Sequence, residues 1–160
     1  MKADQAHSTH VAQVRRAEPS DAFVLAALEL QSNREQGREG EPGFLDRFAD
    51  AWLAERHRRP AWVSKDGDGR PLGAITLYVV DDLPRPGRVS RPWMHVSSLY
   101  VAQWARRTGV GERLLSAGVE WCRQNGAAWV QLSTDPARTS LFRRAGFAAA
   151  DPDLFRLHLK

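Results

Sequence analysis

The feature that most constrains this chain is a glycine turn between an apolar run and a helical one. The run Trp93–Val101 has strand character, residues 106–111 read RRTGVG, and helical spacing follows to about Gln124. Gly109 and Gly111 have no Cβ, so the backbone can turn tightly and bring N–H groups close to a ligand. The helix start adds unpaired donors and the positive end of its dipole. The turn is therefore predicted to bind an anion such as a pyrophosphate. The alternative is that the glycines serve the turn geometry alone.

Length and composition bound the class of protein. A chain of 160 residues fits one domain, which we assign to residues 11–160, after a flexible polar leader at residues 1–10. An apolar fraction of 42% predicts a folded globule, and no apolar run approaches the length that spans a bilayer. The single Cys122 allows no internal disulfide and is expected to be a buried structural thiol. We therefore expect a cytoplasmic protein with no membrane partner.

The positive charge is spread along the chain. The formal net charge is +4 and the isoelectric point is near 9.8. Short basic runs lie at residues 15–16, 56–59, 106–107 and 143–144. This balance suits polyanions such as nucleic acid, but short runs on different elements favour a solvated basic face. A phosphate-rich cofactor would use only some of them.

The expected order of elements is strand, two helices, three strands, helix, strand, helix and one or two terminal strands. Strands are predicted at residues 11–16, 61–65, 72–80, 93–101 and 129–133, and a terminal hairpin from Phe147 in which Phe155, Leu157 and Leu159 alternate. Helices are predicted after the capping residues 18–21, over an apolar stripe at 44–52, from the glycine turn to about 124, and at 136–145. Asp-Gly pairs at 66–69 predict a hairpin turn, and the Pro-rich connection 81–92 is long enough for a lid or binding edge. This order predicts an α/β fold with a mixed central β-sheet flanked by helices.

With that order, two motifs give the chain a resemblance to the GNAT acetyltransferases, the acyl-CoA-dependent N-acetyltransferases. The family carries Arg/Gln-x-x-Gly-x-Gly/Ala at the start of its central helix, matched here by Arg106, Gly109 and Gly111. It also carries an aromatic residue followed by Gly-Phe after its last helix, matched by Phe142, Gly146 and Phe147. The resemblance covers nearly the whole chain after residue 10. It implies a GNAT-like fold and an enzyme that moves an acetyl group from acetyl-CoA to a primary amine, with no metal.

The resemblance also implies where acetyl-CoA lies. The cofactor would sit between the strands at 93–101 and 129–133, with its pyrophosphate on the backbone amides of residues 107–111. Its pantetheine arm would pair like an extra strand, because an amide-containing arm can satisfy a strand edge as a β-strand does. The implied cofactor-binding residues are Leu99, Tyr100, Val101, Arg106, Arg107, Thr108, Gly109, Val110, Gly111, Asp135, Ser140 and Phe142.

Catalysis in the family is direct attack of an amine on the thioester, which needs a neutral amine and a stabilised or protonated leaving thiolate. His95 matches the strand position where the family often has a Glu base, and a mostly neutral imidazole can play that part. The alternative is that His95 simply packs within the strand. The family's usual acid, a Tyr in the last helix, is matched by Phe142, which has no proton to give. Ser140, a water, Tyr100 or Tyr78 could protonate the thiolate, or it could leave unassisted.

The acceptor is a small-molecule or peptide amine that the sequence does not specify further. Four carboxylates near the break between the first two helices could hold a cationic amine, or could belong to a solvated loop; they are Glu35, Glu39, Glu41 and Asp46. Trp93 and the connection 81–92 could form an aromatic wall and a lid. Two other function classes stay open: a non-catalytic acyl-CoA-binding or sensing module, suggested by Phe142, and a basic nucleic-acid-associated protein. A homodimer is also left open.

Overall fold

One five-stranded sheet forms the centre of the protein. The computed structural model describes residues 12–150 and 153–159, so the expected leader at residues 1–10 and the first residue of the expected first strand lie outside the described chain. The sheet order is β1-β2-β3-β4-β5. The antiparallel strands are β1 (Gln13–Arg16), β2 (Ala61–Lys65), β3 (Pro71–Val80) and β4 (Trp93–Val101), and β5 (Val130–Gln131) runs parallel to β4.

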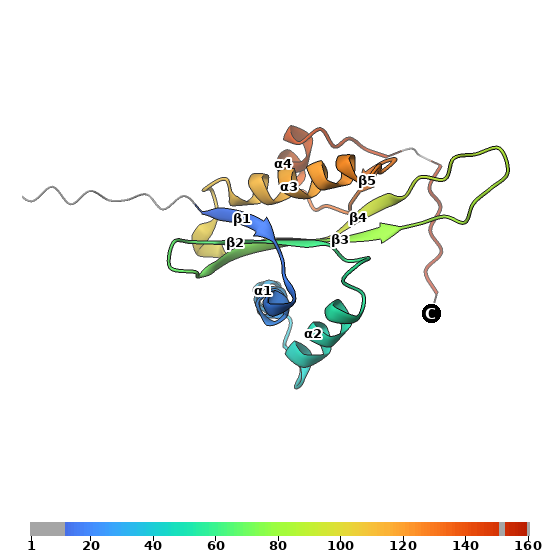
Figure 1. Cartoon of the computed structure of the whole chain (residues 1–160). Helices are drawn as coiled ribbons and strands as arrows, with labels where there is room; N and C mark the ends of the chain where they lie inside the picture. Colours follow the sequence, from blue (N-terminus) through green and yellow to red (C-terminus); the bar gives the residue numbers. More distant parts are fainter. Residues whose placement is uncertain (1–11, 151–152, 160) are drawn as a thin grey trace, which may run out of the picture.

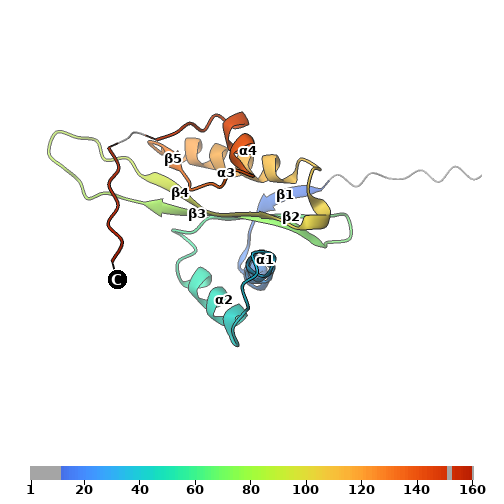
Figure 2. The ribbon, with the colours of Figure 1, turned by 180° about the vertical axis from the view of Figure 1, so that it is seen from behind.

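Helices cover both faces of this sheet. A 3-10 turn, η1 (Pro19–Asp21), leads into α1 (Ala22–Glu35), and α2 (Phe44–Ala54) follows on the same face. The opposite face carries α3 (Val110–Gln124) and α4 (Thr139–Arg144). Figures 1 and 2 show the two helical layers from opposite sides, with the connection 81–92 projecting beyond the ends of β3 and β4. The predicted α/β fold with a mixed, helix-flanked sheet is confirmed. None of the helices in the described ranges is long and apolar enough to cross a membrane.

The core lies between the sheet and its helices. Ile75 and Leu77 of β3 are 0% and 1% exposed and lie under Gly118 of α3. A Cβ at Gly118 would stand 3.3 Å from the Ile75 side chain, so the small residue lets the helix approach the sheet closely. Cys122, on the same helix, is buried as expected, and burial raises the pKa of its thiol to about 11. The thiol is therefore protonated and unreactive at neutral pH.

A buried carboxylate ties the beginning of the chain to the sheet. Asp21 accepts hydrogen bonds from Arg15 of β1 at 2.7 and 2.9 Å, from the Glu18 N–H at 2.8 Å and from Lys65 of β2 at 3.1 Å. Burial alone raises the pKa of this carboxyl, but these bonds outweigh burial and lower the pKa from 3.8 to about 2. The charged form thus fixes the entry of α1 against β1 and β2.

The chain after α3 departs from the sequence prediction. The expected strand at 129–133 is reduced to Val130–Gln131, the expected helix at 136–145 spans Thr139–Arg144, and the terminal hairpin is absent from residues 147–150 and 153–159. Phe155, Leu157 and Leu159 are 81–93% exposed. Their alternation fits a strand, but a strand also needs a partner edge, and a two-residue β5 offers very little backbone to pair with.

Candidate active site

The site begins where β4 and β5 part. These strands pair only at Met94 with Val130 and at His95 with Gln131. In the β3–β4 ladder, Thr76 pairs with Ser98 and Leu77 with Val96, so Ser97 is an extra residue. Such a bulge bends its strand and raises its twist. Beyond His95, β4 therefore continues without a strand neighbour on its β5 side in the described chain.

The backbone of Leu99 and Val101 faces that unpaired edge. The Leu99 carbonyl accepts a hydrogen bond from Arg138 at 2.8 Å, and the Val101 carbonyl accepts one from Arg106 at 3.1 Å. In a strand the N–H and C=O of one residue point to the same edge, so their N–H groups point there too. An amide-containing chain laid along this edge would find both donors and acceptors at strand spacing.

The glycine turn follows directly at the end of β4. A 3-10 turn, η2 (Gln103–Ala105), leads to Arg107 and Gly109, which both have left-handed backbones with φ of 63° and 81°. The Thr108 hydroxyl donates to the Ala105 carbonyl at 2.5 Å and so fixes the turn. Helix α3 starts at Val110 with no side-chain cap, which leaves its first N–H groups for an external acceptor. The predicted strand, turn and helix are all present.

Gly111 lies inside the first turn of α3 and faces the gap between β4 and α4. A Cβ built on it would stand 3.5 Å from Val101 Cγ2 and 3.7 Å from Leu141 Cδ2. Both are ordinary van der Waals distances, so the fold itself would accept a Cβ here. The absence of a side chain leaves a space between strand and helix next to the turn, which fits the close approach of a narrow ligand chain.

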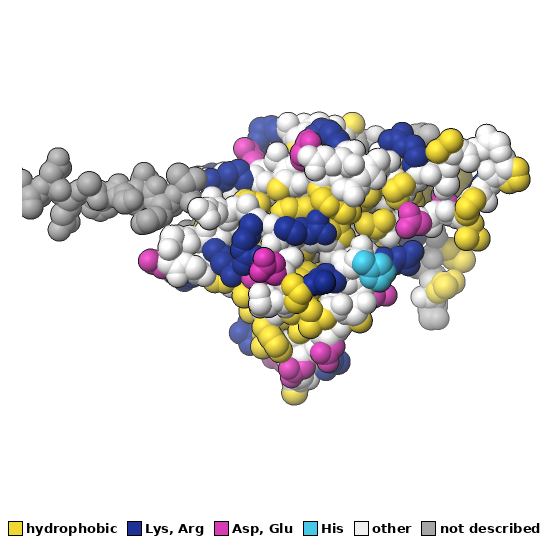
Figure 3. Space-filling model, in the orientation of Figure 1, with side chains coloured by type: hydrophobic (Ala, Val, Ile, Leu, Met, Phe, Trp, Pro, Cys, Tyr) yellow, Lys and Arg dark blue, Asp and Glu magenta, His cyan; other side chains and the backbone are white. Residues whose placement is uncertain are grey.

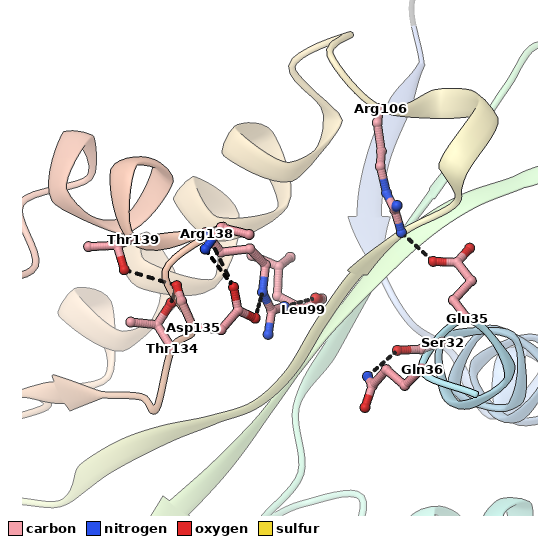
Figure 4. A network of polar contacts seen from close by, with 10 residues as sticks. Ser32, Glu35, Gln36, Leu99, Arg106, Thr134, Asp135, Arg138 and Thr139 are labelled. Carbon is pink, nitrogen blue, oxygen red and sulfur yellow. Dashed lines mark hydrogen bonds and ion pairs between the residues drawn. The ribbon is translucent and has the colours of Figure 1, made fainter. Parts of the chain in front are cut away.

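Arg106 points toward α1. Its guanidinium donates to Glu35 at 2.5 Å (Figure 4). The Tyr100 hydroxyl donates to the other oxygen of that carboxylate at 2.6 Å. Burial and the hydrogen bond to Glu35 raise the pKa of Tyr100. Burial raises the pKa of Glu35, but the bonds from Tyr100 and Arg106 outweigh it and lower that pKa. This cluster holds the end of α1 against β4, and it commits the Tyr100 hydroxyl, one of the candidate acids, to Glu35.

Arg138 reaches the unpaired edge from the opposite side. It lies just before α4, where Asp135 Oδ1 accepts from the N–H groups of Ala137 and Arg138 at 2.9 and 3.2 Å. Asp135 Oδ2 accepts from Arg138 Nε at 3.3 Å, and the guanidinium then donates to Leu99 (Figure 4). Arg138 was not among the site residues predicted from the sequence. The Asp-Pro-Ala-Arg run, which has the form of an Asx turn, was the available signal for the local geometry, but not for the contact with Leu99.

The face of β4 toward α1 carries the other polar groups. Ser98 donates to Glu29 of α1 at 3.0 Å, and His95 lies in register with Tyr78 of β3. The His95 imidazole is partly exposed and has no hydrogen-bond partner within the described chain. Arg59 stacks over the Tyr78 ring at 4.7 Å. His95 is thus placed with free nitrogen atoms on the face that α1 and α2 cover.

Phe142 and Ser140 differ in environment. Phe142 is 4% exposed and its ring meets Phe147 edge-on at 5.9 Å. Ser140 is exposed on α4. The aromatic and Gly-Phe positions of the second motif therefore form a packed pair that fixes α4 against the chain after it.

Two of the four carboxylates expected on the acceptor side, and Trp93, contact neighbouring side chains. Glu35 pairs with Arg106, and Glu41 pairs with Arg47. Trp93 stacks on Trp129, with ring centres 5.7 Å apart and planes 13° apart. The two rings form a stacked pair at the start of β4, and their part in an acceptor site stays a prediction.

The molecular surface does not concentrate its positive charge on the face seen in Figure 3. Lys and Arg side chains there are separated by acidic, apolar and neutral ones. On this face the basic side chains therefore form no single continuous patch. Among the described residues, no three His, Cys, Asp or Glu side chains gather in a way that could hold a metal ion.

Comparison with known proteins agrees with this geometry. Residues 24–147 match the model of the acetyltransferase (GNAT) family. The chain is 30% identical over 123 residues to YhfO of Bacillus subtilis (strain 168), named an uncharacterized N-acetyltransferase, and the match covers 76% of this chain and 78% of that protein.

Solved structures show the same fold. A predicted acetyltransferase with acetyl-CoA from Clostridium acetobutylicum has a TM-score of 0.76 at 13% identity, and the match covers 92% of this chain and 96% of that one. A GCN5-related N-acetyltransferase from Ralstonia eutropha JMP134 has a TM-score of 0.69 at 23% identity, with 91% and 98% covered.

Proposed function

Because the chain belongs to the GNAT acetyltransferase family and is an N-acetyltransferase, we propose that it moves an acetyl group from acetyl-CoA to a primary amine by direct attack. One observation carries the proposal. The unpaired edge of β4 presents Leu99 and Val101 at strand spacing and leads straight into the glycine turn before α3. A ligand with an amide arm and a pyrophosphate matches that sequence of groups.

The donor would lie along β4 with its pyrophosphate at the turn. Backbone N–H groups of residues 107–111 would bind the phosphate oxygens, and exposed Arg107 would add charge. The arm would pair with Leu99 and Val101 and use the space that Gly111 leaves beside Leu141. Arg106 would act indirectly in this arrangement, because its guanidinium is held by Glu35 and the Val101 carbonyl.

The acceptor amine would approach from the face of β4 that α1 and α2 cover. His95 lies on that face without a hydrogen-bond partner in the described chain, so its imidazole can accept the proton that the amine loses. The amine nitrogen would attack the thioester carbon, and an N–H group of the β4 edge would polarise the thioester carbonyl. The acceptor is assigned only as a primary amine on a small molecule or peptide.

Two measurements test this function. Titration calorimetry should detect acetyl-CoA binding to the wild type and none to Gly111→Glu, whose side chain would fill the arm's space and place a negative charge against phosphate. A thiol-release assay across a library of amines should then find an acceptor. Unchanged affinity in Gly111→Glu would contradict the donor site. Tight acetyl-CoA binding with no turnover on any amine would favour an acyl-CoA-binding module instead.

A further inference from the structure

The leaving thiolate needs a partner that Phe142 cannot supply. The ring of Phe142 is buried against Phe147 and carries no ionisable proton. One turn earlier, at the start of the same helix, the Arg138 carbonyl accepts from the Phe142 N–H at 3.4 Å. Arg138 therefore lies on the same side of α4 as Phe142, one turn nearer the start of the helix, and its side chain extends to β4.

The position of the Arg138 guanidinium is fixed from two sides. Asp135 holds its Nε atom at 3.3 Å, and the Leu99 carbonyl accepts from another of its nitrogens at 2.8 Å. Asp135 is itself held by two N–H groups of its own turn. The side chain thus spans the gap between α4 and β4 and brings a cation to the unpaired edge, as Figure 4 shows.

This edge is where the thioester end of the donor arm would arrive. The proposed arm enters at the turn beside Gly111, passes Val101 and reaches Leu99, which lies nearest the bulge at Ser97. An arm amide that pairs with the Leu99 carbonyl would replace the bond from Arg138. The guanidinium would keep its link to Asp135 and its charge, and would have free donors next to the sulfur.

From this geometry we propose that Arg138 stabilises the thiolate of coenzyme A as it leaves. The inference rests on the proposed function. The amine nitrogen forms a bond to the acetyl carbon, the C–S bond breaks, and its electron pair stays on sulfur. The amine's proton passes to the base or to water. The thiolate pairs with the Arg138 guanidinium and takes a proton from solvent on release, so no side-chain acid is required.

A cation differs from an acid in a measurable way, because it lowers the pKa of the bound thiol. The assay is a pH titration of the complex with reduced coenzyme A, followed by the ultraviolet absorbance of the thiolate. Cys122 is the protein's single cysteine, and burial raises its pKa to about 11, so coenzyme A supplies the signal near neutral pH. Asp135 is the acidic group in contact with Arg138 and is unchanged in the variants used.

In the wild type, the bound thiol should have a pKa about one pH unit or more below that of the free thiol. Arg138→Met should abolish that difference, which means about tenfold less thiolate at pH 7, and Arg138→Lys should keep part of it. Arg143→Met, an exposed arginine of the same helix, is the matched control and should leave the thiol pKa unchanged. In turnover, Arg138→Met should lower kcat more than it raises KM for acetyl-CoA.

Desulfo-coenzyme A, which lacks the sulfur, separates contact with the thiolate from contact with the arm. It should bind wild type and Arg138→Met alike. An unchanged thiol pKa in Arg138→Met would overturn the inference. So would an equal loss of affinity for coenzyme A and its desulfo analogue with no pKa difference, which would make Arg138 a residue that only holds the arm. Failure of the wild type to bind coenzyme A at all would instead refute the proposed function.

Discussion

Replacing Gly111 by Ala should make the protein more stable and its donor site weaker. The new Cβ would stand 3.5 Å from Val101 Cγ2 and 3.7 Å from Leu141 Cδ2, so the fold accepts it without strain. Alanine is the better helix former by roughly 0.5–1 kcal/mol, and Gly111 lies in the first turn of α3. The free energy of unfolding should therefore rise by up to about 1 kcal/mol.

The same methyl group would occupy the space that the proposed donor arm needs. Overfilling a packed space costs about 1–3 kcal/mol, which corresponds to about 5- to 150-fold weaker binding of acetyl-CoA. The control is Gly109→Ala. Gly109 has a φ of 81°, and a Cβ added to it would meet no heavy atom within 4 Å, so its substitution changes backbone strain without filling space. An L-residue there costs about 1–2 kcal/mol, and this variant should lose stability.

Denaturant unfolding and titration calorimetry on the same preparations check both effects. Gly111→Ala should have a higher free energy of unfolding and a lower affinity for acetyl-CoA than the wild type. A Gly111→Ala protein that gains stability and binds acetyl-CoA as tightly as the wild type would show that the arm does not pass beside α3. A Gly111→Ala protein that loses stability would show that the fold does not accept a Cβ at this position.

Single residues carry three further predictions. The folded-state pKa of Asp21 is lowered to about 2, so its contribution of about 2 kcal/mol to the free energy of unfolding is present above pH 4 and is lost as the pH falls toward 2. Acid unfolding curves should show this decline in stability, and Asp21→Asn should lack most of the decline. His95→Ala should lower kcat/KM and remove the ascending limb of its pH profile, whereas a retained limb would assign that limb to the substrate amine. Since a thiolate paired with Arg138 requires no side-chain acid, Phe142→Tyr should leave turnover largely unchanged, and a clear rise in turnover would show that proton delivery limits the rate; because Phe142 is 4% exposed, an unpartnered hydroxyl would cost about 1–3 kcal/mol, and thermal unfolding must be measured beside the rate.

Local patterns predicted much of the fold. Strand β4 has the predicted bounds of Trp93–Val101, because an apolar run is closed on one side by a Pro-rich connection and on the other by a glycine turn. The hairpin at 66–69 formed where two Asp-Gly pairs specify a tight turn, and Asp66 accepts from the N–H groups of Asp68 and Arg70. In each case the information lies within a few residues of the element.

Contacts between distant residues could not be predicted from local sequence patterns. Arg106 meets Glu35, 71 residues away, and Arg138 meets Leu99, 39 residues away. The motif assigned Arg106 to the donor turn, but the structure directs its guanidinium to α1. A spacing rule gives the element on which a side chain sits, and the direction of a long side chain depends on which charges the tertiary fold brings near it.

The two arginines at the β4 edge also suggest why that edge can exist without a strand partner. Unpaired strand edges attract other strands, and buried carbonyls without donors cost free energy. Guanidinium groups from Arg106 and Arg138 satisfy the Val101 and Leu99 carbonyls from opposite sides. A side chain can rotate away when an amide arm arrives, whereas a paired β-strand would have to be pulled from the sheet. The same contacts that satisfy the edge therefore leave it accessible to a donor. The link between Arg138 and Asp135 does not involve β4, so Arg138 can stay beside the ligand after its hydrogen bond to the Leu99 carbonyl is broken.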